Sequence, residues 1–490
     1  SRCRISEAMS ADGLRGVLGR IFAGAAVCVS SRSTKDADAI MKEVTPWEIE
    51  AAKKQVAAAF TKPVEPCGLH FAWFMAFAIF LFQCSSQMFR SLASILIKPL
   101  IAEEGFTTTD TSLPGALSFL TIALTLPFGQ ILVNKFGARP VLVICLALVA
   151  LGTGLTGAVT KPWHLFLLWG LVIGPAKGLS FNTYTILTTR FFETHRGLVT
   201  GVLTSGSALG MMMFLEPITI ITNEFGWRTA AGLCALVPMS VIPFICLFVR
   251  SYPRDVGLGP YGSAEAYPTP GTPAPPPPPK PSIKELLIKP VRAHPISFVT
   301  MGFPVALNGV TTFGLIATHL IPSAIDVGME ATAAALLLTI IGGCNLIGTA
   351  IAGAITDRMQ AKGLKLKWLL FFYFFLRGVL FFALPRVMGP LLEWKVIVLV
   401  VLIGFDFLAV VPPMLALCNQ TWGDQIGPAM FGWMFALHQL GAAAGALVPG
   451  NIRDAFGSYD SAWTLACILC FVGAFQIAFV PTPSKSTEMM

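Results

Sequence analysis

The stretch GAITDRMQAKG, Gly353 to Gly363, ends a long run of apolar residues that contains hardly a charge. The run stops at a Gly, three spacer residues and an Asp-Arg pair. A diverged copy, QILVNKFGAR from Gln130 to Arg139, ends another apolar run in the other half of the chain. One motif that recurs in both halves at the end of an apolar run predicts a duplicated membrane unit.

The composition also places the chain in a membrane. It has 490 residues, of which 54% are hydrophobic and 12% charged, with a mean hydropathy of +0.71. A soluble protein usually carries about 25% charged residues. The apolar runs reach about 18 residues or more, which suits membrane-spanning helices better than the short alternating strands of an outer-membrane barrel. For such an all-α membrane protein the net charge of +8 describes the loops, and we expect no nucleic-acid partner.

Twelve spans are expected, six on each side of a proline-rich linker. They cover residues 71–97, 112–133, 140–159, 163–187, 197–222 and 229–249, then 295–321, 331–355, 368–385, 396–418, 428–450 and 461–480. Two similarly oriented sets of six helices, related by an axis along the membrane normal, are a known transporter architecture. We therefore predict two six-helix bundles.

The spans divide the sequence into five parts. These are an N-terminal cytoplasmic extension or targeting segment at 1–66, a first bundle at 67–250, a cytoplasmic linker at 251–294, a second bundle at 295–482 and a tail at 483–490. The run APPPPPKPS predicts that the linker is an extended spacer. The Arg- and Ser-rich residues 1–40 fit a targeting peptide, and a gene-model artefact is the alternative.

Lys and Arg residues gather on one set of loops. They include Lys135, Arg139, Arg190, Arg196, Arg358, Lys362 and the basic residues of the linker. The positive-inside rule places these loops, the linker and both termini in the cytosol. We expect a multi-pass protein in the lipid bilayer of the plasma membrane or an organelle, with a monomeric functional unit.

Several stretches resemble one transporter family. They are RFFETHRGLVTGVLTSGSALG, FGWR, RDVGLGPYG, THLIPSAIDVG, GAITDR and HQLGAAAGA, spread between residues 70 and 480. These stretches resemble the major facilitator superfamily, whose loop motif reads Gly-x-x-x-Asp-Arg-x-Gly-x-Arg. Within it the chain is most similar to the branch of monocarboxylate transporters and oxalate/formate antiporters. The resemblance implies two six-helix bundles that alternate between openings to the two sides of the membrane.

The resemblance also identifies two gating-loop motifs. Their residues are Asn134, Lys135, Gly137 and Arg139 in the first half, and Gly353, Asp357 and Arg358 in the second. In the first copy Gln130, Asn134 and Lys135 replace the family's Gly, Asp and Arg, so we expect weaker charge-based contacts there. The second copy loses the trailing Gly and Arg after Met359.

Charged residues inside the spans are the candidates for function, because each costs roughly 2.5–3.5 kcal/mol at a helix centre. Arg90 lies in span one, Lys177 in span four and Asp406 in span ten. The resemblance implies that spans one, four, seven and ten line a central cavity. The polar residues that span seven would add to it are Asn308, Thr311 and Thr312. Two cations among polar groups predict a binding site for a small organic anion.

The position of Arg90 allows two interpretations. It lies only about two turns from the end of its span, so its side chain could extend to the membrane surface. However, MFRSLASILIK resembles the first-span segment of the branch, which has Lys-Ser at the position of Arg90 and Ser91, and that position is implicated there in carboxylate binding. Antiporter relatives that handle dicarboxylates carry an Arg in span eight, whereas span eight of this chain has Asn345 and no Arg, which argues against a dicarboxylate such as oxalate.

Two residues are candidates for proton coupling. Asp406 in span ten and His438 in span eleven both lie within the membrane, and histidine changes charge near neutral pH without any perturbation. Each has a structural alternative. Asp406 would then neutralise Arg377 at a similar depth in span nine, and His438 would be a neutral residue bonded to a carbonyl group.

No enzyme signature competes with transport, since the sequence contains no HExxH, GxSxG or Walker motif. The 11 cysteines are scattered, and we expect no metal and no cofactor. We expect secondary active transport of a small organic anion, a monocarboxylate, together with protons. The alternatives are an exporter or antiporter of another small metabolite, and a membrane sensor that does not transport.

Overall fold

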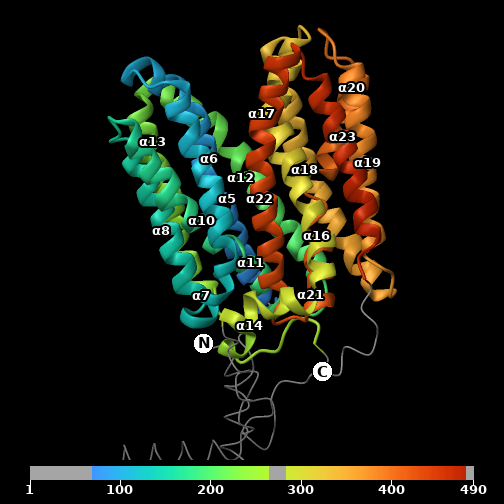
Figure 1. The fold of residues 1–490 in the computed structure, drawn as a ribbon. Coiled ribbons are helices and arrows are strands. Elements are labelled where there is room, and N and C mark those ends of the chain that lie inside the picture. The colour runs from blue at the N-terminus through green and yellow to red at the C-terminus, as the bar shows by residue number, and fades with distance from the viewer. Residues whose placement is uncertain (1–68, 264–282, 482–490) are drawn as a thin grey trace, which may run out of the picture. The chain divides into compact units, whose positions relative to one another are not determined.

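Every regular element that the structure describes is a helix. The computed structural model describes residues 69–263 and 283–481, so the expected N-terminal extension, the proline-rich run of the linker and the tail lie outside the described residues. Within these ranges, twelve spans are long and apolar enough to cross a membrane. The expected all-α fold with twelve spans is confirmed (Figure 1).

The first half contains spans one to six. Its elements are α5 (Phe71–Glu104), α6 (Thr108–Thr125), η2 (Leu126–Phe128), α7 (Gly129–Phe136), α8 (Ala138–Thr156), α9 (Pro162–Leu165), η3 (Phe166–Ile173), α10 (Gly174–Phe181), α11 (Thr183–Phe191), α12 (Arg196–Phe225) and α13 (Trp227–Phe248), with the short turn η4 (Pro253–Val256) after them. Some spans extend beyond their predicted ends, because glycine and not hydropathy ends the helix. Gly137 (φ +88°) follows α7 and Gly226 (φ +82°) follows α12.

The second half contains spans seven to twelve. Its elements are α14 (Ile283–Leu287), α15 (Lys289–Ala293), α16 (Pro295–Gly309), η5 (Val310–Ile316), α17 (Ala317–Asp326), α18 (Ala331–Ala361), α19 (Lys367–Val387), α20 (Trp394–Asp406), α21 (Val411–Trp422), α22 (Gly427–Phe456) and α23 (Asp460–Ala478). Large aromatic side chains fill the space between these helices. Phe381 packs edge-on against Trp463, with 5.4 Å between the ring centroids.

Spans four, seven and ten are interrupted helices. Span four contains the π-helical stretch η3, span seven contains the π-helical stretch η5, and span ten is broken between Asp406 and Val411. Irregular backbone is tolerated at membrane depth only where protein or a water-filled cavity satisfies its polar groups. These interruptions therefore mark where the interior of the protein differs from a simple packed bundle.

The two halves meet along a seam between α12 and α18. Glycines allow the backbones to approach, because a Cβ atom on Gly201 would lie 2.1 Å from the carbonyl oxygen of Thr349. A Cβ on Gly353 would lie 2.0 Å from the carbonyl oxygen of Gly197. Small residues at such positions let membrane helices pack closely. The structure thus explains the glycine spacing that opens span five.

Polar contacts close the same end of the two halves. Asn182 donates to the carbonyl oxygen of Pro428 at 2.6 Å, and Arg196 forms an ion pair with Asp424 at 2.8 Å. Farther along α12, residues 213–217 are exposed or half-exposed in the part of the chain that the structure describes. The halves are therefore joined at the end that carries the loop motifs, which is the predicted cytoplasmic end.

Asp357 of the second loop motif caps a helix of the other half. His195 precedes α12 without a side-chain hydrogen bond to it, so the first amide groups of that helix need another acceptor. The two carboxylate oxygens of Asp357 accept hydrogen bonds from the amides of Gly197 at 2.7 Å and Leu198 at 2.9 Å. A carboxylate is favoured there because a helix N-terminus carries partial positive charge.

The seam can be tested with one added methyl group. Gly201→Ala should force α12 and α18 apart and destabilise the protein by about 1–3 kcal/mol, as overpacking usually does. Gly232→Ala in α13 is the matched control, because a Cβ there meets nothing within 4 Å. Both changes gain the same helix propensity, so their melting temperatures in detergent isolate the contact. Equal melting temperatures for the two variants would show that the seam has room.

Candidate functional site

A cavity between the two halves is lined by residues from both. Its polar lining consists of Gln83, Ser86, Gln87 and Arg90 of α5, Lys177 and Ser180 of α10, Thr204 and Ser207 of α12, and Gln439 of α22. Its apolar lining consists of Ile122, Phe181, Phe313, Leu408 and Phe435. The cavity volume open to the centres of water-sized groups is about 40 Å³. Measured in the same way, about 10–15 Å³ is enough for one water molecule. The cavity therefore has room for a few water molecules, or for a ligand of comparable size.

Lys177 reaches this cavity from α10 and is held by neutral oxygen atoms. Its Nζ donates to the carbonyl oxygen of Ser86 at 3.2 Å and to Oε1 of Gln87 at 3.0 Å. The side chain is buried, with 7% of its surface exposed. No ion pair joins Lys177 to a carboxylate among the described residues. An ammonium group has three donors, and these two contacts leave one for a ligand.

Arg90 reaches the cavity from α5 and lies between two aromatic rings. Its guanidinium carbon is 4.8 Å from the ring centre of Phe119 in the first half and 5.0 Å from that of Phe313 in the second. Cation–π contacts of this kind stabilise a charge by about 0.5–2 kcal/mol. Of the two interpretations of Arg90, the structure favours the one in which the side chain faces the interior.

The electrostatic result is a cavity with two cations. Within the described ranges, neither Arg90 nor Lys177 has an ion-pair partner. Uncompensated positive charge in a region of low dielectric constant attracts an anion more strongly than the same charge in water. The arrangement can therefore bind a small anion, and a carboxylate can accept hydrogen bonds from both cations at once.

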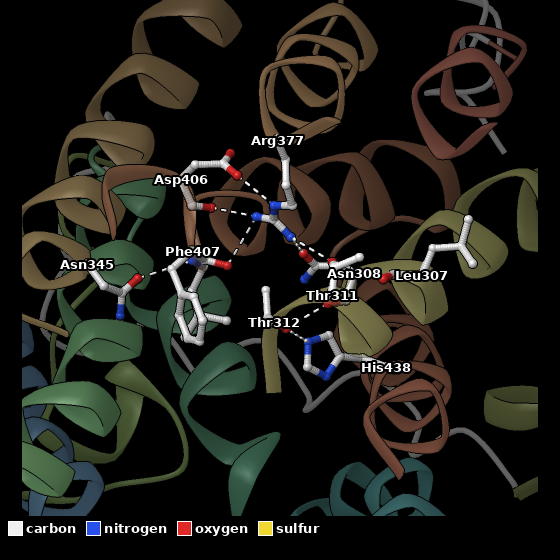
Figure 2. A network of polar contacts seen from close by, with 10 residues as sticks. Leu307, Asn308, Thr311, Thr312, Asn345, Arg377, Asp406, Phe407 and His438 are labelled. Atoms are coloured by element: carbon white, nitrogen blue, oxygen red, sulfur yellow. Dashed lines mark hydrogen bonds and ion pairs between the residues drawn. The ribbon is translucent and has the colours of Figure 1, made fainter. Parts of the chain in front are cut away.

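The polar residues of span seven lie behind the cavity wall. Asn308, Thr311 and Thr312 are buried, and the cavity lining does not include them. Asn308 Oδ1 and, at 3.5 Å, Thr311 Oγ1 accept hydrogen bonds from one guanidinium nitrogen of Arg377 (Figure 2). The structure thus gives Asn308 and Thr311 contacts with Arg377, and the role of these residues in ligand binding stays a prediction.

Asp406 also lies behind the wall, paired with Arg377. Its Oδ2 accepts from Arg377 Nε at 2.6 Å, and both side chains are 2% exposed. Oδ1 of Asp406 has no hydrogen-bond partner among the described residues. The alternative in which Asp406 neutralises Arg377 agrees with this geometry, although the free oxygen leaves room for a proton.

His438 lies closer to the cavity than Asp406 does. Its ring stacks on Phe435 at 4.7 Å and 5°, and it meets Phe313 edge-on at 5.5 Å; both phenylalanines line the cavity. Nδ1 lies 3.4 Å from Oε1 of Gln439, and Nε2 lies 3.3 Å from Oγ1 of Thr312. The Thr312 hydroxyl donates to the carbonyl oxygen of Asn308 at 2.6 Å, so its own oxygen is free to accept a hydrogen bond from the ring, as Oε1 of Gln439 also is. A doubly protonated His438 would thus have an acceptor on each side.

The two gating-loop motifs make different contacts. In the first copy Asn134 Oδ1 accepts from Arg190 at 2.6 Å, within its own half, and Arg139 donates to the carbonyl oxygen of Val249 at 3.2 Å. Lys135 lies over the ring of the neighbouring Phe136. In the second copy Asp357 caps α12 across the seam, while Arg358 is exposed. Both copies reach the other half, since Gln130 of the first copy donates to the carbonyl oxygen of Gln425, but only the second copy does so through an acidic residue among the described residues.

The sequence interpretation missed the neutral polar lining. Gln83 and Gln87 lie four residues apart on α5, and Arg90 follows three residues later. Residues at this spacing share one face of a helix, so the three side chains form a polar stripe in an apolar span. That periodicity was the available signal. Phe119 and Phe313 carried no such signal, because an aromatic residue in a membrane helix is ordinary.

Comparisons with known proteins agree with this architecture. Residues 79–446 match the model of the Major Facilitator Superfamily. Monocarboxylate transporter 13 of Bos taurus is 25% identical over 72% of this chain and 76% of its own length. Monocarboxylate transporter 11 of Mus musculus is 25% identical over 86% of this chain and 90% of its own length.

Solved structures show the same fold. A variant of the E. coli fucose:proton symporter FucP superimposes with a TM-score of 0.58 at 15% identity, over 82% of this chain and 98% of FucP. A second FucP structure, in the outward conformation, has the same score and identity. At this identity the likeness concerns the fold alone. With twelve membrane spans in two bundles and a family match over most of its length, the chain belongs to the major facilitator superfamily of membrane transporters.

Proposed function

We propose that this transporter carries a small monocarboxylate together with protons, and that the anion binds between Arg90 and Lys177. The observation that supports this most strongly is the pair of cations on one internal cavity, with no carboxylate paired to either among the described residues. The names of the relatives, which are monocarboxylate transporters, point to the same class of substrate.

The rest of the lining favours one carboxylate over two. Apart from the two cations, the polar lining consists of neutral amides and hydroxyls, and the remainder is aromatic or aliphatic. A second carboxylate would leave water for a surface that offers it no further charge, which is costly. A monocarboxylate places its charged end at Arg90 and Lys177 and its apolar part against Phe313, Leu408 and Phe435.

His438 is the proton carrier that the geometry supports best. It shares Phe313 with Arg90, since the ring of Phe313 contacts both side chains. A proton on His438 adds a third positive charge to this region, and a bound carboxylate offsets that charge. Binding of the anion and binding of the proton therefore favour each other, which is reciprocal coupling. Asp406 stays the alternative carrier because of its unpartnered Oδ1.

The transport cycle follows from the seam. The halves are joined at the predicted cytoplasmic end, and α12 is uncovered toward its other end. We assign this arrangement to the state that is closed to the cytosol. Substrate release then requires the Asp357 cap and the Arg196–Asp424 ion pair to open.

The orientation can be tested with an epitope placed in the linker between residues 264 and 282. Because the linker is predicted to be cytoplasmic, an antibody should reach it only after the cell membrane is permeabilised. An epitope inserted at residues 389–391, in the loop between spans nine and ten at the opposite end, is the control and should be reached in intact cells. The reverse pattern would invert the assigned orientation.

The anion site can be tested by changing its charges. Arg90→Gln and Lys177→Gln should each weaken binding of pyruvate or lactate by about 1.5–3 kcal/mol, or roughly ten- to a hundredfold, because a charge-assisted hydrogen bond is lost. Arg90→Lys should keep partial uptake. The measurement is labelled uptake into proteoliposomes under a pH gradient. Lys395→Gln, an exposed cation outside the cavity, is the control. Near-wild-type uptake by the Arg90→Gln/Lys177→Gln double variant would rule out this site.

Proton coupling can be tested with His438→Gln. Glutamine keeps a hydrogen-bonding group beside Thr312 but cannot take up a proton near neutral pH. We expect exchange of labelled for unlabelled acid to continue, while accumulation driven by a pH gradient is lost. Asp406→Asn keeps an acceptor for Arg377 and should stay coupled. Should Asp406→Asn lose the coupling and His438→Gln keep it, Asp406 would be the carrier.

A further inference from the structure

The break in span ten is encoded by two prolines. α20 ends at Asp406 and α21 begins at Val411, followed directly by Pro412 and Pro413. Proline has no backbone N–H, so Pro412 and Pro413 donate no helical hydrogen bond to the carbonyl groups of Leu408 and Ala409, four residues earlier. The intervening backbone tightens instead. Phe407 N donates to Gly404 O at 3.3 Å and Ala409 N donates to Asp406 O at 3.2 Å, each across three residues.

Side chains from two neighbouring helices bind further backbone groups of the same break. One guanidinium nitrogen of Arg377 on α19 donates to the carbonyl oxygens of Asp406 at 2.7 Å and Phe407 at 3.2 Å (Figure 2). Oδ1 of Asn345 on α18 accepts from the amide of Leu408 at 3.1 Å. An unsatisfied backbone group in a membrane costs several kcal/mol, so these contacts make the break stable. We call Arg377, Asp406 and Asn345 the span-ten clasp.

Arg377 therefore does more than balance the charge of Asp406. Its Nε pairs with the Asp406 carboxylate, while another nitrogen caps the C-terminus of α20, where a cation is favoured by the helix dipole. The flat guanidinium can make both contacts at once because its donors form a fixed fork, which the single ammonium of lysine cannot reproduce. A charge pair alone would not require the contacts to two main-chain carbonyls.

The clasp holds a segment that faces the cavity. Leu408, whose amide is bound by Asn345, lines the cavity. Phe407 packs edge-on against Phe313 at 5.7 Å and 89°, and Phe313 lies beneath the guanidinium of Arg90 at 5.0 Å. The clasp therefore holds the turn of backbone that carries this part of the cavity wall.

We propose that the span-ten clasp positions Leu408, which lines the cavity, and Phe407, which supports the lining residue Phe313, as the wall that limits the size of the transported acid, with Arg377 and Asn345 as positioning residues. This inference rests on the proposed function, since it assumes that the cavity binds the acid. The wall stays in place only while its backbone groups are held from α18 and α19. When one of these contacts is lost, the wall becomes mobile and bulky acids are excluded less strictly.

The test compares uptake of a small acid, acetate, with uptake of a bulky acid, phenylacetate, by the full chain in proteoliposomes. Asn345→Leu keeps the same branched shape, with two methyl groups in place of the amide oxygen and nitrogen, but offers no acceptor to Leu408 N. We expect it to raise the phenylacetate-to-acetate ratio of kcat/KM by roughly three- to tenfold, the effect of one hydrogen bond, mainly through a lower KM for phenylacetate. Asn345→Asp keeps an acceptor and should hold the ratio within about twofold of the wild type.

Two further variants separate positioning from folding. Thr356→Val is the matched control, because Thr356 is a buried polar residue of the same helix that bonds only to the carbonyl oxygen of Ala352. Arg377→Lys keeps the charge beside Asp406 but not the fork, so it should raise the ratio as well. It therefore tests the clasp independently, also in the case that Asn345→Leu does not fold. Leu408→Ala removes part of the wall itself and should raise it too.

The outcomes distinguish this inference from the proposed function. If the wild type takes up neither acid, the proposed function fails and the inference fails with it. If the wild type transports acetate through Arg90 and Lys177, but Asn345→Leu and Arg377→Lys both keep the ratio of Thr356→Val, the clasp has no positioning role. The cavity would then remain the anion site, with a wall that is set by other contacts.

Discussion

A polar group inside a bilayer must find its partner within the protein, and much of this structure follows from that constraint. It accounts for the hydrogen bonds that Arg377 and Asn345 make with backbone groups at the break in span ten. It also explains why the first amides of α12 are met by a carboxylate from the opposite half. In both places a polar side chain supplies a hydrogen bond that the backbone of the helix does not supply itself. The irregular parts of the fold are therefore its most strongly specified parts.

The two cations of the cavity differ from the charged pair that lies behind them. Arg377 and Asp406 neutralise each other, whereas neither cavity cation has an ion-pair partner among the described residues. Arg90 is stabilised by aromatic rings and Lys177 by neutral oxygens, which leaves their charges available. Such an arrangement costs stability in the absence of a ligand and recovers it when an anion binds. It is the pattern expected of a site that must both attract its substrate and release it.

The sequence alone predicted the fold well, because hydropathy over long windows is a strong signal for membrane helices. It also led to Arg90 and Lys177, since a charge in an apolar span is conspicuous. Gln83, Gln87 and Gln439 were missed because a neutral amide disturbs hydropathy much less. Thr311 and Thr312 of span seven were harder to place, because they lie in the π-helical stretch η5, which changes the number of residues per turn. Within such a stretch, the face of a residue cannot be read from a 3.6-residue period.

The cap that Asp357 places on α12 has a consequence for the symmetry of the molecule. Asp357 of the second loop copy reaches the first amides of a helix in the other half, whereas Asn134 of the first copy binds Arg190 in its own half and Gln130 donates to the carbonyl oxygen of Gln425. A carboxylate therefore takes part in the seam between α12 and α18, while Asn182, which precedes α11, joins Pro428 of α22 through neutral groups. Contacts that hold the two halves together thus differ in chemistry from one side of the molecule to the other, so separating them would cost different amounts of free energy. The repeat is symmetric in architecture but not in its contacts.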